Sequence, residues 1–317
     1  MAYFRGEIDV AEHTTISVFE LFKMIPDAET ARVYLESRLW PNGPTCPVCA
    51  SGERITTRKG GYYRCNACHE DFTVRTGTIF ERSHIPLNKW IYAMYMLVTA
   101  RKGISSVQIS KEIGVTQKSA WFMMHRIREA CAGNMRQLRG IVEIDETYVG
   151  GLEKNKHEHK KLKLGRGPVG KTPVFAMRER GKGGRTLAMV TTDMNLEAIR
   201  DAIYRNVEMG STIHTDDAPI YDGVGELFYR HDTVNHSIKE FSRGDVTTNG
   251  IESVFAVFKR GLIGVYHLMS VKHMGSYVQE FTFRLNEGHC SIKTIDRIQS
   301  LIAGVSGKRL TYAALIQ

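Results

Sequence analysis

The chain has 317 residues, of which 42% are hydrophobic and 24% are charged. This length indicates two or three domains, and the composition excludes a disordered chain. The net charge of +9 favours a polyanionic partner, with nucleic acid before anionic membrane. The most apolar run, residues 90–100, is too short for a bilayer, which takes about 20 residues. Because no targeting segment is visible either, we expect a cytoplasmic protein with no membrane partner.

The first predicted elements are helices within residues 14–40. An apolar stripe begins at residues 18–25, with Ser17 as a possible cap, and residues 26–29 are typical of a second helix start with an acidic first turn. The proline- and glycine-rich residues 40–44 end this region. We therefore expect an N-terminal helical region over residues 1–44.

Two cysteine pairs follow this helical region. The segments Cys46-Pro-Val-Cys49 and Cys65-Asn-Ala-Cys68 have the spacing of a tetrahedral zinc site with four thiolate ligands. The alternative is four free cysteines. We predict a zinc ribbon over residues 45–80 that needs its metal to fold. The two isolated cysteines, Cys131 and Cys290, are predicted to be buried free thiols.

Residues 81–135 are predicted to form a helical DNA-binding region. Ser105 or Ser106 can cap one helix, Gly114 can supply a turn, and Thr116 can cap a second helix. This order is typical of a helix-turn-helix, and an ordinary αα-hairpin is the alternative.

The second of these helices would enter the major groove by its N-terminal end. The side chains expected to face the bases there are Gln117, Lys118 and Ser119. Farther along the helix, Arg126 and Arg128 are expected to reach phosphates.

From residue 141 short β-branched runs alternate with glycine-rich turns, which predicts an α/β domain over residues 140–305. Strands are expected at 141–149, 173–177, 186–191 and 211–215, and helices at 196–207 and 251–260.

Acidic residues occupy notable places in these elements. Asp145 is embedded in the first strand, where a carboxylate is costly unless it is paired or binds metal. Strand alternation puts it on the same face as Glu143. Asp216 ends the fourth strand and Glu252 opens the last helix, with Lys259 two turns along on the same helix face. Such acids can hold a divalent metal while the lysine holds a phosphate, although each acid alone could also be a strand-end or first-turn acid.

Residues 151–185 carry 11 Lys or Arg against 3 Asp or Glu. We expect an arm that contacts the DNA backbone through Lys160, Lys161 and Lys163, and a solvated loop is the alternative. Residues 165–172 match the phosphate-loop pattern G-x-x-x-x-G-K-[ST], but they lead into a predicted strand instead of a helix. Nucleotide binding is therefore not expected.

These features resemble the zinc-ribbon DDE transposases of bacterial insertion sequences, in the ISXO-like group. The segments that carry the resemblance span most of the chain: Arg38–Gly43, Cys46–Cys68, Glu143–Gly151, Gly170–Val174, Thr215 and Asp216 with Tyr221, Val234–Ser237, Thr248–Glu252, Phe258–Gly261 and Gly264–His267.

The resemblance implies a ribonuclease-H-like catalytic domain, a mixed sheet flanked by helices. Its catalytic and metal-binding set would be Asp145, Asp216 and Glu252, assisted by Lys259. Asn249 is a rival or a partner of Glu252 as the third metal ligand. The family often has histidine where this chain has Thr247, a departure that could weaken activity.

The function implied by the resemblance is that of a transposase. Such an enzyme binds terminal inverted repeats and target DNA, and cleaves and joins strands with two Mg²⁺ or Mn²⁺ ions. It would act in the bacterial cytoplasm, at the nucleoid, as at least a homodimer on double-stranded DNA. The alternatives are a catalytically inactive DNA-binding regulator and a structure-selective nuclease that cuts without joining.

Overall fold

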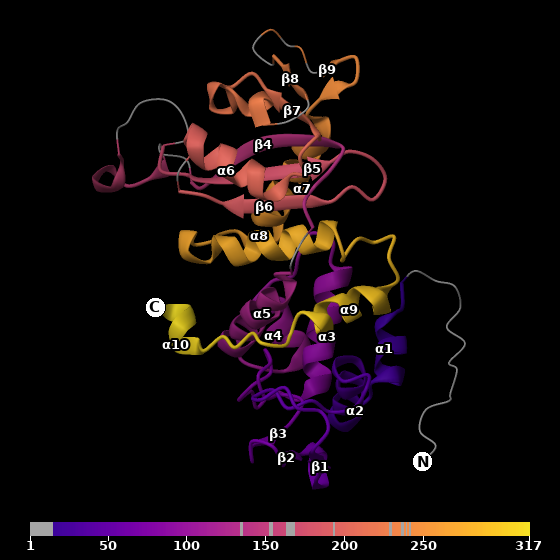
Figure 1. Ribbon diagram of the computed structural model, residues 1–317. Coiled ribbons are helices and arrows are strands. Elements are labelled where there is room, and N and C mark those ends of the chain that lie inside the picture. Colours follow the sequence, from indigo (N-terminus) through magenta and orange to yellow (C-terminus); the bar gives the residue numbers. More distant parts are fainter. Residues whose placement is uncertain are drawn as a thin grey trace. The chain divides into compact units, whose positions relative to one another are not determined.

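A computed structural model describes residues 15–133, 136–151, 155–162, 169–192, 194–227, 230–235, 238, 240 and 242–317. Backbone contacts divide the chain into two compact units. The N-terminal unit comprises the chain up to Cys131 together with Glu287–Gln317, and the sheet unit comprises Ala132–Asn286 (Figure 1).

The N-terminal unit begins with two capped helices, α1 (Val18–Met24) and α2 (Ala28–Leu39). Ser17 and Glu20 form a reciprocal capping box, in which the Ser17 amide donates to Glu20 Oε2 at 2.6 Å. Asp27 Oδ1 accepts from the Thr30 amide at 2.8 Å and caps α2. The predicted helix starts in this segment are confirmed.

The ribbon that follows is a small antiparallel sheet of β1 (Ile55–Thr57), β2 (Tyr63–Cys65) and β3 (Asp71–Phe72), with a 3-10 turn η1 (Lys59–Gly61). Its aromatic core is small: Trp40 packs edge-on against both Tyr63 and Phe72. A core of this size is typical of small domains that a bound metal stabilises.

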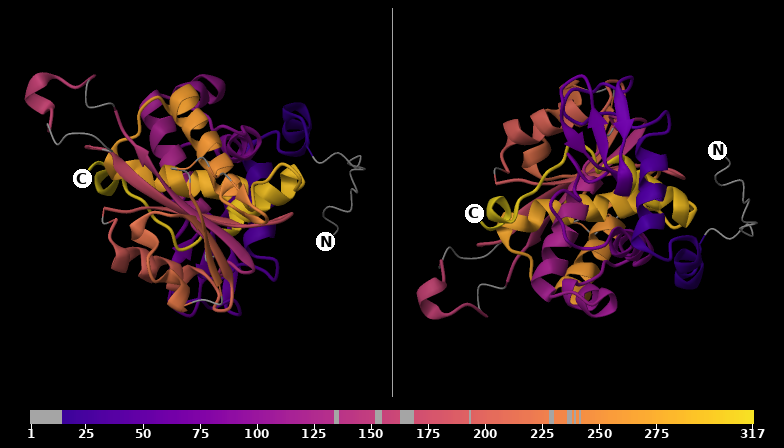
Figure 2. Two further views of the ribbon diagram at one scale, coloured as in Figure 1. Left: turned by 90° about the horizontal axis from the view of Figure 1, so that it is seen from above. Right: turned by 90° about the horizontal axis from the view of Figure 1, so that it is seen from below.

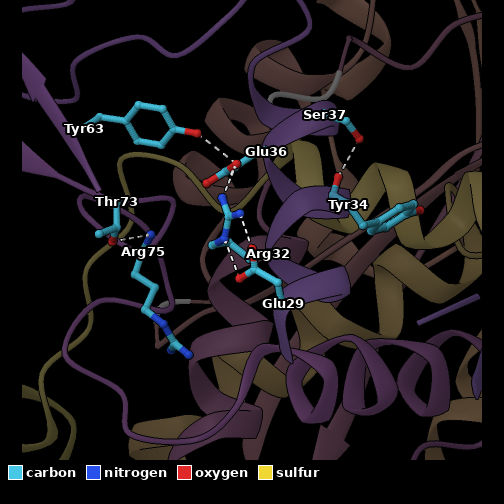
Figure 3. Close-up of polar contacts among 8 residues, drawn as sticks. All are labelled: Glu29, Arg32, Tyr34, Glu36, Ser37, Tyr63, Thr73 and Arg75. Carbon is cyan, nitrogen blue, oxygen red and sulfur yellow. Dashed lines mark hydrogen bonds and ion pairs between the residues drawn. The ribbon is translucent and has the colours of Figure 1, made fainter. Parts of the chain in front are cut away.

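Polar side chains connect helix α2 to the ribbon (Figure 3). Glu36 Oε2 accepts from Tyr63 Oη at 3.0 Å and from Arg32 Nη1 at 2.6 Å. The Arg32 side chain also passes over Gly61, where an added Cβ would lie 2.4 Å from Arg32 Cδ. Since Gly61 also has a φ of 74°, another residue at this crossing would be strained.

The rest of the N-terminal unit is helical: α3 (Leu87–Thr99), α4 (Ser106–Ile113), α5 (Gln117–Cys131), α9 (Thr294–Ala303) and α10 (Tyr312–Ile316). Helix α9 packs against α2, α3 and α5. Arg297 is buried in α9 and donates to the Val98 carbonyl, and Gly304 lies against the Ala130 carbonyl, which leaves no room for a side chain. The chain after Asn286 therefore folds with this unit, whereas the sequence predicts a catalytic domain that continues to residue 305.

The sheet unit is built on five strands: β4 (Ile141–Val149), β5 (Thr172–Glu179), β6 (Thr186–Val190), β7 (Thr212–Asp216) and β8 (Arg230–Val234). Their order is β6-β5-β4-β7-β8. The β6, β5 and β4 strands are antiparallel, while β4, β7 and β8 run parallel. This is the predicted ribonuclease-H-like mixed sheet. The sequence does not predict β8, because its residues Arg-His-Asp-Thr-Val lack an apolar alternation.

Helices cover both faces of this sheet (Figure 2). On one face, α6 (Leu196–Asn206) buries Ile199 and Ile203 against β4, β5 and β7. The other face carries α7 (Asn249–Gly261), the π-helical turn η7 (Leu262–Tyr266) and α8 (Val271–Leu285), which share a second core with β4 and β5. Asn286, just after α8, exchanges two hydrogen bonds with the backbone of Thr186 and so fixes the edge strand β6.

Shorter elements connect this framework: η3 (Glu158–Lys160), η4 (Pro219–Tyr221), η5 (Val224–Leu227), β9 (Ser242–Arg243) and β10 (Val246–Thr247). Among the described residues, no single helix is both long and apolar enough to cross a membrane. The stretch Asn249–Tyr266 and the helix Val271–Leu285 would pass that test only together, and they are bent by 120°.

Candidate active site

The four cysteines of the ribbon converge on one point. Their sulfur atoms all lie within 4.8 Å of one another, with Cys46 Sγ 3.6 Å from Cys68 Sγ and Cys49 Sγ 3.5 Å from Cys65 Sγ. A tetrahedral zinc ion with Zn–S bonds of about 2.3 Å would hold sulfurs about 3.8 Å apart, so the site fits zinc. In the absence of a metal the thiols are shifted in opposite directions: a hydrogen bond from the backbone N–H of Cys68 lowers the pKa of Cys65 to about 6, whereas burial raises the pKa of Cys68 to about 12.

Cys131 and Cys290 lie outside this cluster. Neither is buried as predicted: Cys131, at the end of α5, is half-buried, and Cys290, in the loop before α9, is exposed.

Two helices joined by a tight turn form where the sequence predicts a helix-turn-helix or an ordinary αα-hairpin. Ser105 Oγ caps α4 by accepting from the Gln108 amide, Gly114 adopts a φ of 62° between the helices, and Thr116 Oγ1 accepts from the Ser119 amide at the start of α5. Gln117 and Lys118 are exposed at this end of α5.

The remaining two candidates on α5 lie elsewhere. Arg126 is only 3% exposed, and its guanidinium donates to the Glu81 carbonyl and stacks on Trp90. Burial also lowers its pKa, to about 10. Arg128 is buried as well. The prediction that these two arginines reach DNA phosphates is therefore wrong, because α5 turns this face into the core of the N-terminal unit.

The basic segment is described only in part. Lys161 Nζ pairs with Glu158 at 2.8 Å next to the turn η3. Lys163 and the side chain of Lys160 lie outside the described residues. Thr172, the last residue of the phosphate-loop pattern, begins strand β5, so no helix follows that pattern.

The sheet brings two of the predicted acids together. The parallel register of β4 and β7 pairs Ile141 with Thr212 and Glu143 with His214. Continued by two residues, this register places Asp145 level with Asp216. Both side chains are half-buried. Asp216 is the last residue of β7, and Asp145 lies in the middle of β4, beside that end of β7.

The third acid, Glu252, is exposed in the first turn of α7, where Thr248 Oγ1 donates to its Oε1 at 3.2 Å. Lys259 is exposed two turns farther along the same helix. Asn249, the first residue of α7, is also exposed, and its amide donates to Thr247 Oγ1 at 3.1 Å.

The charges of Asp216 and Glu252 both act on Asp145. Burial, followed by the charges of Glu146, Asp216 and Glu252, raises the pKa of Asp145 to about 7. The amide of Glu146, which donates to Asp145 Oδ1 at 2.7 Å, acts in the opposite direction. Among the described residues only the four cysteines bring three or more ligand atoms within 4.8 Å of one another, so the acids form a looser group.

Sequence reasoning did not single out Glu146. Burial raises the pKa of its carboxyl, and Asp216 raises it too. Glu146 accepts a 2.6 Å hydrogen bond from the buried Tyr221, whose own pKa is raised by burial and by this carboxylate. Two features of the sequence could have indicated Glu146. It follows Asp145 directly, and its partner Tyr221 is among the residues that carry the family resemblance.

The sheet unit is thus a ribonuclease-H-like mixed sheet with acids on its two central parallel strands, and it follows a four-cysteine ribbon and a pair of helices joined by a tight turn. Comparison with known families agrees. The family model of the ISXO2-like transposase domain matches residues 137–286, and that of the transposase zinc-ribbon domain matches residues 26–71. The chain belongs to the ISXO2-like transposase family.

One relative is the "Uncharacterized protein in transposable element ISH50" of Halobacterium salinarum. It is 31% identical over 261 residues, which cover 77% of this chain and 86% of the relative. Among solved structures, the chain is similar to a component of the simian T-cell lymphotropic virus intasome in complex with PP2A regulatory subunit B56 gamma. That match has 16% identity and a TM-score of 0.30, and covers 64% of this chain and 70% of the other. A TM-score this low does not define a shared fold.

Proposed function

We propose that this chain is an insertion-sequence transposase that binds the terminal inverted repeats of its element and catalyses Mg²⁺- or Mn²⁺-dependent strand cleavage and strand transfer. The observation that supports this proposal is the position of Asp145, level with Asp216 in the β4–β7 register and close enough to Glu252 to be influenced by its charge. Burial and the neighbouring charges together raise the pKa of Asp145 to about 7. Burying carboxylates near one another is unfavourable unless the site has a use for their combined charge.

The donor set fits a divalent cation. Carboxylate oxygens are the ligands that Mg²⁺ and Mn²⁺ prefer, and a bound cation would offset the repulsion among the acids. Asp145, Asp216 and Glu252 would hold it, with the Asn249 side chain as a rival or an additional ligand. When bound, a pair of such ions activates the attacking oxygen and stabilises the leaving oxygen of an in-line phosphoryl transfer.

The chain's own groups have separate tasks in this scheme. Asp145 must lose its proton before it can act as a ligand. Lys259, exposed on α7 with Glu252, supplies a positive charge for a strand phosphate. The same acids can serve cleavage and then joining, because neither step needs a covalent bond between enzyme and DNA.

DNA recognition is assigned to other parts of the chain. Gln117, Lys118 and Ser119 at the start of α5 would read base edges in the major groove. The lysines at 160, 161 and 163 would contact the backbone. We propose the order of domains that the sequence predicts, with a ribbon at 45–80, a helix-turn-helix region at 81–135 and a catalytic domain that begins at 140. We also propose at least a homodimer on DNA, since two ends must meet.

The test uses purified protein, Mg²⁺ and labelled DNA that carries the element's terminal repeats. Asp145→Asn should keep repeat binding and lower cleavage by about 10³-fold or more. The substitution weakens the binding of a metal ion that would stabilise the transition state by several kcal/mol. Asp201→Asn is a matched control, since this exposed acid on α6 forms an ion pair with its helix neighbour Arg205 and should leave cleavage unchanged.

Each outcome separates the alternatives. Cleavage and joining that disappear in Asp145→Asn support the transposase. Repeat binding without cleavage by the unmodified protein in Mg²⁺ or Mn²⁺ indicates an inactive regulator, with Thr247 the first residue to change. Cleavage without joining indicates a nuclease. Full cleavage by Asp145→Asn would remove this acid from the mechanism.

A further inference from the structure

A second carboxylate lies on the same face of β4 as Asp145, two residues before it. Glu143 is 3% exposed, inside the sheet unit. A carboxylate buried this deeply is stable only when its oxygens are hydrogen-bonded or paired with a cation. The partners of Glu143 therefore indicate why it is there.

One partner is the start of helix α7. Glu143 Oε2 accepts from the amide of Ile251 at 3.0 Å, across 108 positions of sequence. Gly250 is in such close contact that an added Cβ would lie 2.5 Å from the same oxygen. A negative charge at this end of the helix also interacts favourably with the helix dipole. The first turn of α7 thus rests directly on the Glu143 carboxylate.

The other partner is Arg180, just after β5. Its Nε donates to Glu143 Oε1 at 2.9 Å, and its Nη2 donates to the Thr247 carbonyl at 2.9 Å. Nη1 donates to the carbonyl of Asp245. A single guanidinium therefore holds Glu143 and the backbone that leads into α7, a task that requires its planar fork.

The buried His214 completes this arrangement. Its Nδ1 lies 3.1 Å from Arg180 Nη2. Because a guanidinium has only donors, Nδ1 is the acceptor in this contact. His214 also stands opposite Glu143 in the β4–β7 register, so the network spans both central strands.

We infer that Glu143 and Arg180 are positioning residues that fix the N-terminus of α7, and with it Glu252 and Asn249, relative to Asp145. Glu143 holds the amide directly before Glu252 while it lies two residues from Asp145 on the same strand. This inference rests on the proposed function, because it assigns these residues to the geometry of the metal-binding acids.

The sheet unit contains a matched control. Glu179 is also a buried glutamate, 5% exposed, on the neighbouring strand β5. It pairs with Arg136 through bonds of 2.6 and 2.9 Å and accepts from the amides of Arg139 and Arg185, none of which lies in α7. Glu143→Gln and Glu179→Gln each remove a buried charge from the same sheet, but only Glu143 contacts α7.

The first measurement is hydrogen exchange of the full-length protein without divalent metal. In Glu143→Gln we expect the amides of residues 249–253 to exchange at least about tenfold faster, the factor that follows from losing one charged hydrogen bond. In Glu179→Gln their exchange should stay as in the unmodified protein. Gly250→Ala keeps both charges but displaces the first turn, and should behave like Glu143→Gln.

The second measurement is the Mn²⁺ concentration that half-saturates the protein, followed by the loss of the free-ion electron paramagnetic resonance signal. Groups that orient metal ligands typically affect affinity by about 10- to 100-fold. We expect a shift of that size in Glu143→Gln and Gly250→Ala and no shift in Glu179→Gln. In the cleavage assay the same two variants should lose kcat without a higher KM for DNA, and added Mn²⁺ should recover part of the rate.

A folded Glu143→Gln protein with normal protection of α7 and normal Mn²⁺ affinity would overturn the inference. So would an equal loss of Mn²⁺ affinity in Glu179→Gln, because the effect would then be general destabilisation. If the unmodified protein binds no Mn²⁺ and cleaves no DNA, the proposed function fails, whereas hydrogen exchange still decides whether Glu143 holds α7.

Discussion

The zinc ribbon and the acid cluster both gather metal-ligating side chains, but they do so over different distances in the sequence. Cys46 and Cys68 are 22 positions apart, and short strands and tight turns bring all four sulfurs within 4.8 Å. The acids come from β4, β7 and α7. A hydrogen bond between Ile251 on α7 and Glu143 on β4 spans 108 positions of sequence. The ribbon site is a local structure, whereas the acid site depends on the whole sheet unit.

This difference predicts how each site fails. Cys65→Ser, or removal of zinc by a chelator, should unfold the ribbon because its small aromatic core cannot hold the fold alone. We expect loss of far-UV circular dichroism from this segment and loss of repeat binding. Divalent metal binding by the acids should remain. A ribbon that keeps its structure without zinc would show that the cysteines are not what stabilises it.

Helix α5 offers a similar contrast, between a buried side chain that stabilises the fold and an exposed one that is expected to bind DNA. Arg126→Ala removes a buried guanidinium that bonds to Glu81 and stacks on Trp90, so it should lower the free energy of unfolding by about 2–4 kcal/mol. Lys118→Ala, at the exposed start of the helix, should change stability by less than about 0.5 kcal/mol and weaken DNA binding. Denaturant unfolding and a binding titration measure both effects. Equal stability of the two variants would contradict the buried position of Arg126.

The smallest expected effect concerns the basic segment. Changing the lysines at 160, 161 and 163 to glutamine should reduce the slope of log affinity against log salt by about 0.9 for each phosphate that is no longer neutralised, or about 3 in all. Catalytic metal binding should be unaffected. A slope equal to that of the unmodified protein would indicate that this segment is a solvated loop. Lys161 would then keep its salt bridge to Glu158 when DNA is bound.

These two regions also show how far a sequence can predict a site. The cysteine spacing, the caps at Ser17 and Thr116 and the turn at Gly114 are local signals, and the structure reproduces the elements that they predict. Strand β4 is predictable to the residue because its run of β-branched and apolar residues ends at the glycine pair 150–151.

Features that depend on distant contacts are not predictable in this way. Nothing near Arg126 in the sequence shows that its helix face is buried, and Arg180 stands in a run of basic residues with no mark of its contact to Glu143. The polar edge strand β8 and the return of α9 to the N-terminal unit are likewise products of tertiary packing. The acids at positions 145, 216 and 252 are predicted from their places in strands and a helix, while their influence on the pKa of Asp145 depends on the sheet register.

The most direct test of the acid cluster is Mn²⁺ binding as a function of pH, in the unmodified protein and in Asp145→Asn. Because the pKa of Asp145 is raised to about 7, this carboxyl is protonated at lower pH, and the proton competes with the metal. We predict that Mn²⁺ affinity increases as the pH rises through 7, and that Asp145→Asn loses most of the affinity together with this pH dependence. Equal Mn²⁺ affinity in the two proteins across this pH range would show that the acid cluster is not a metal site.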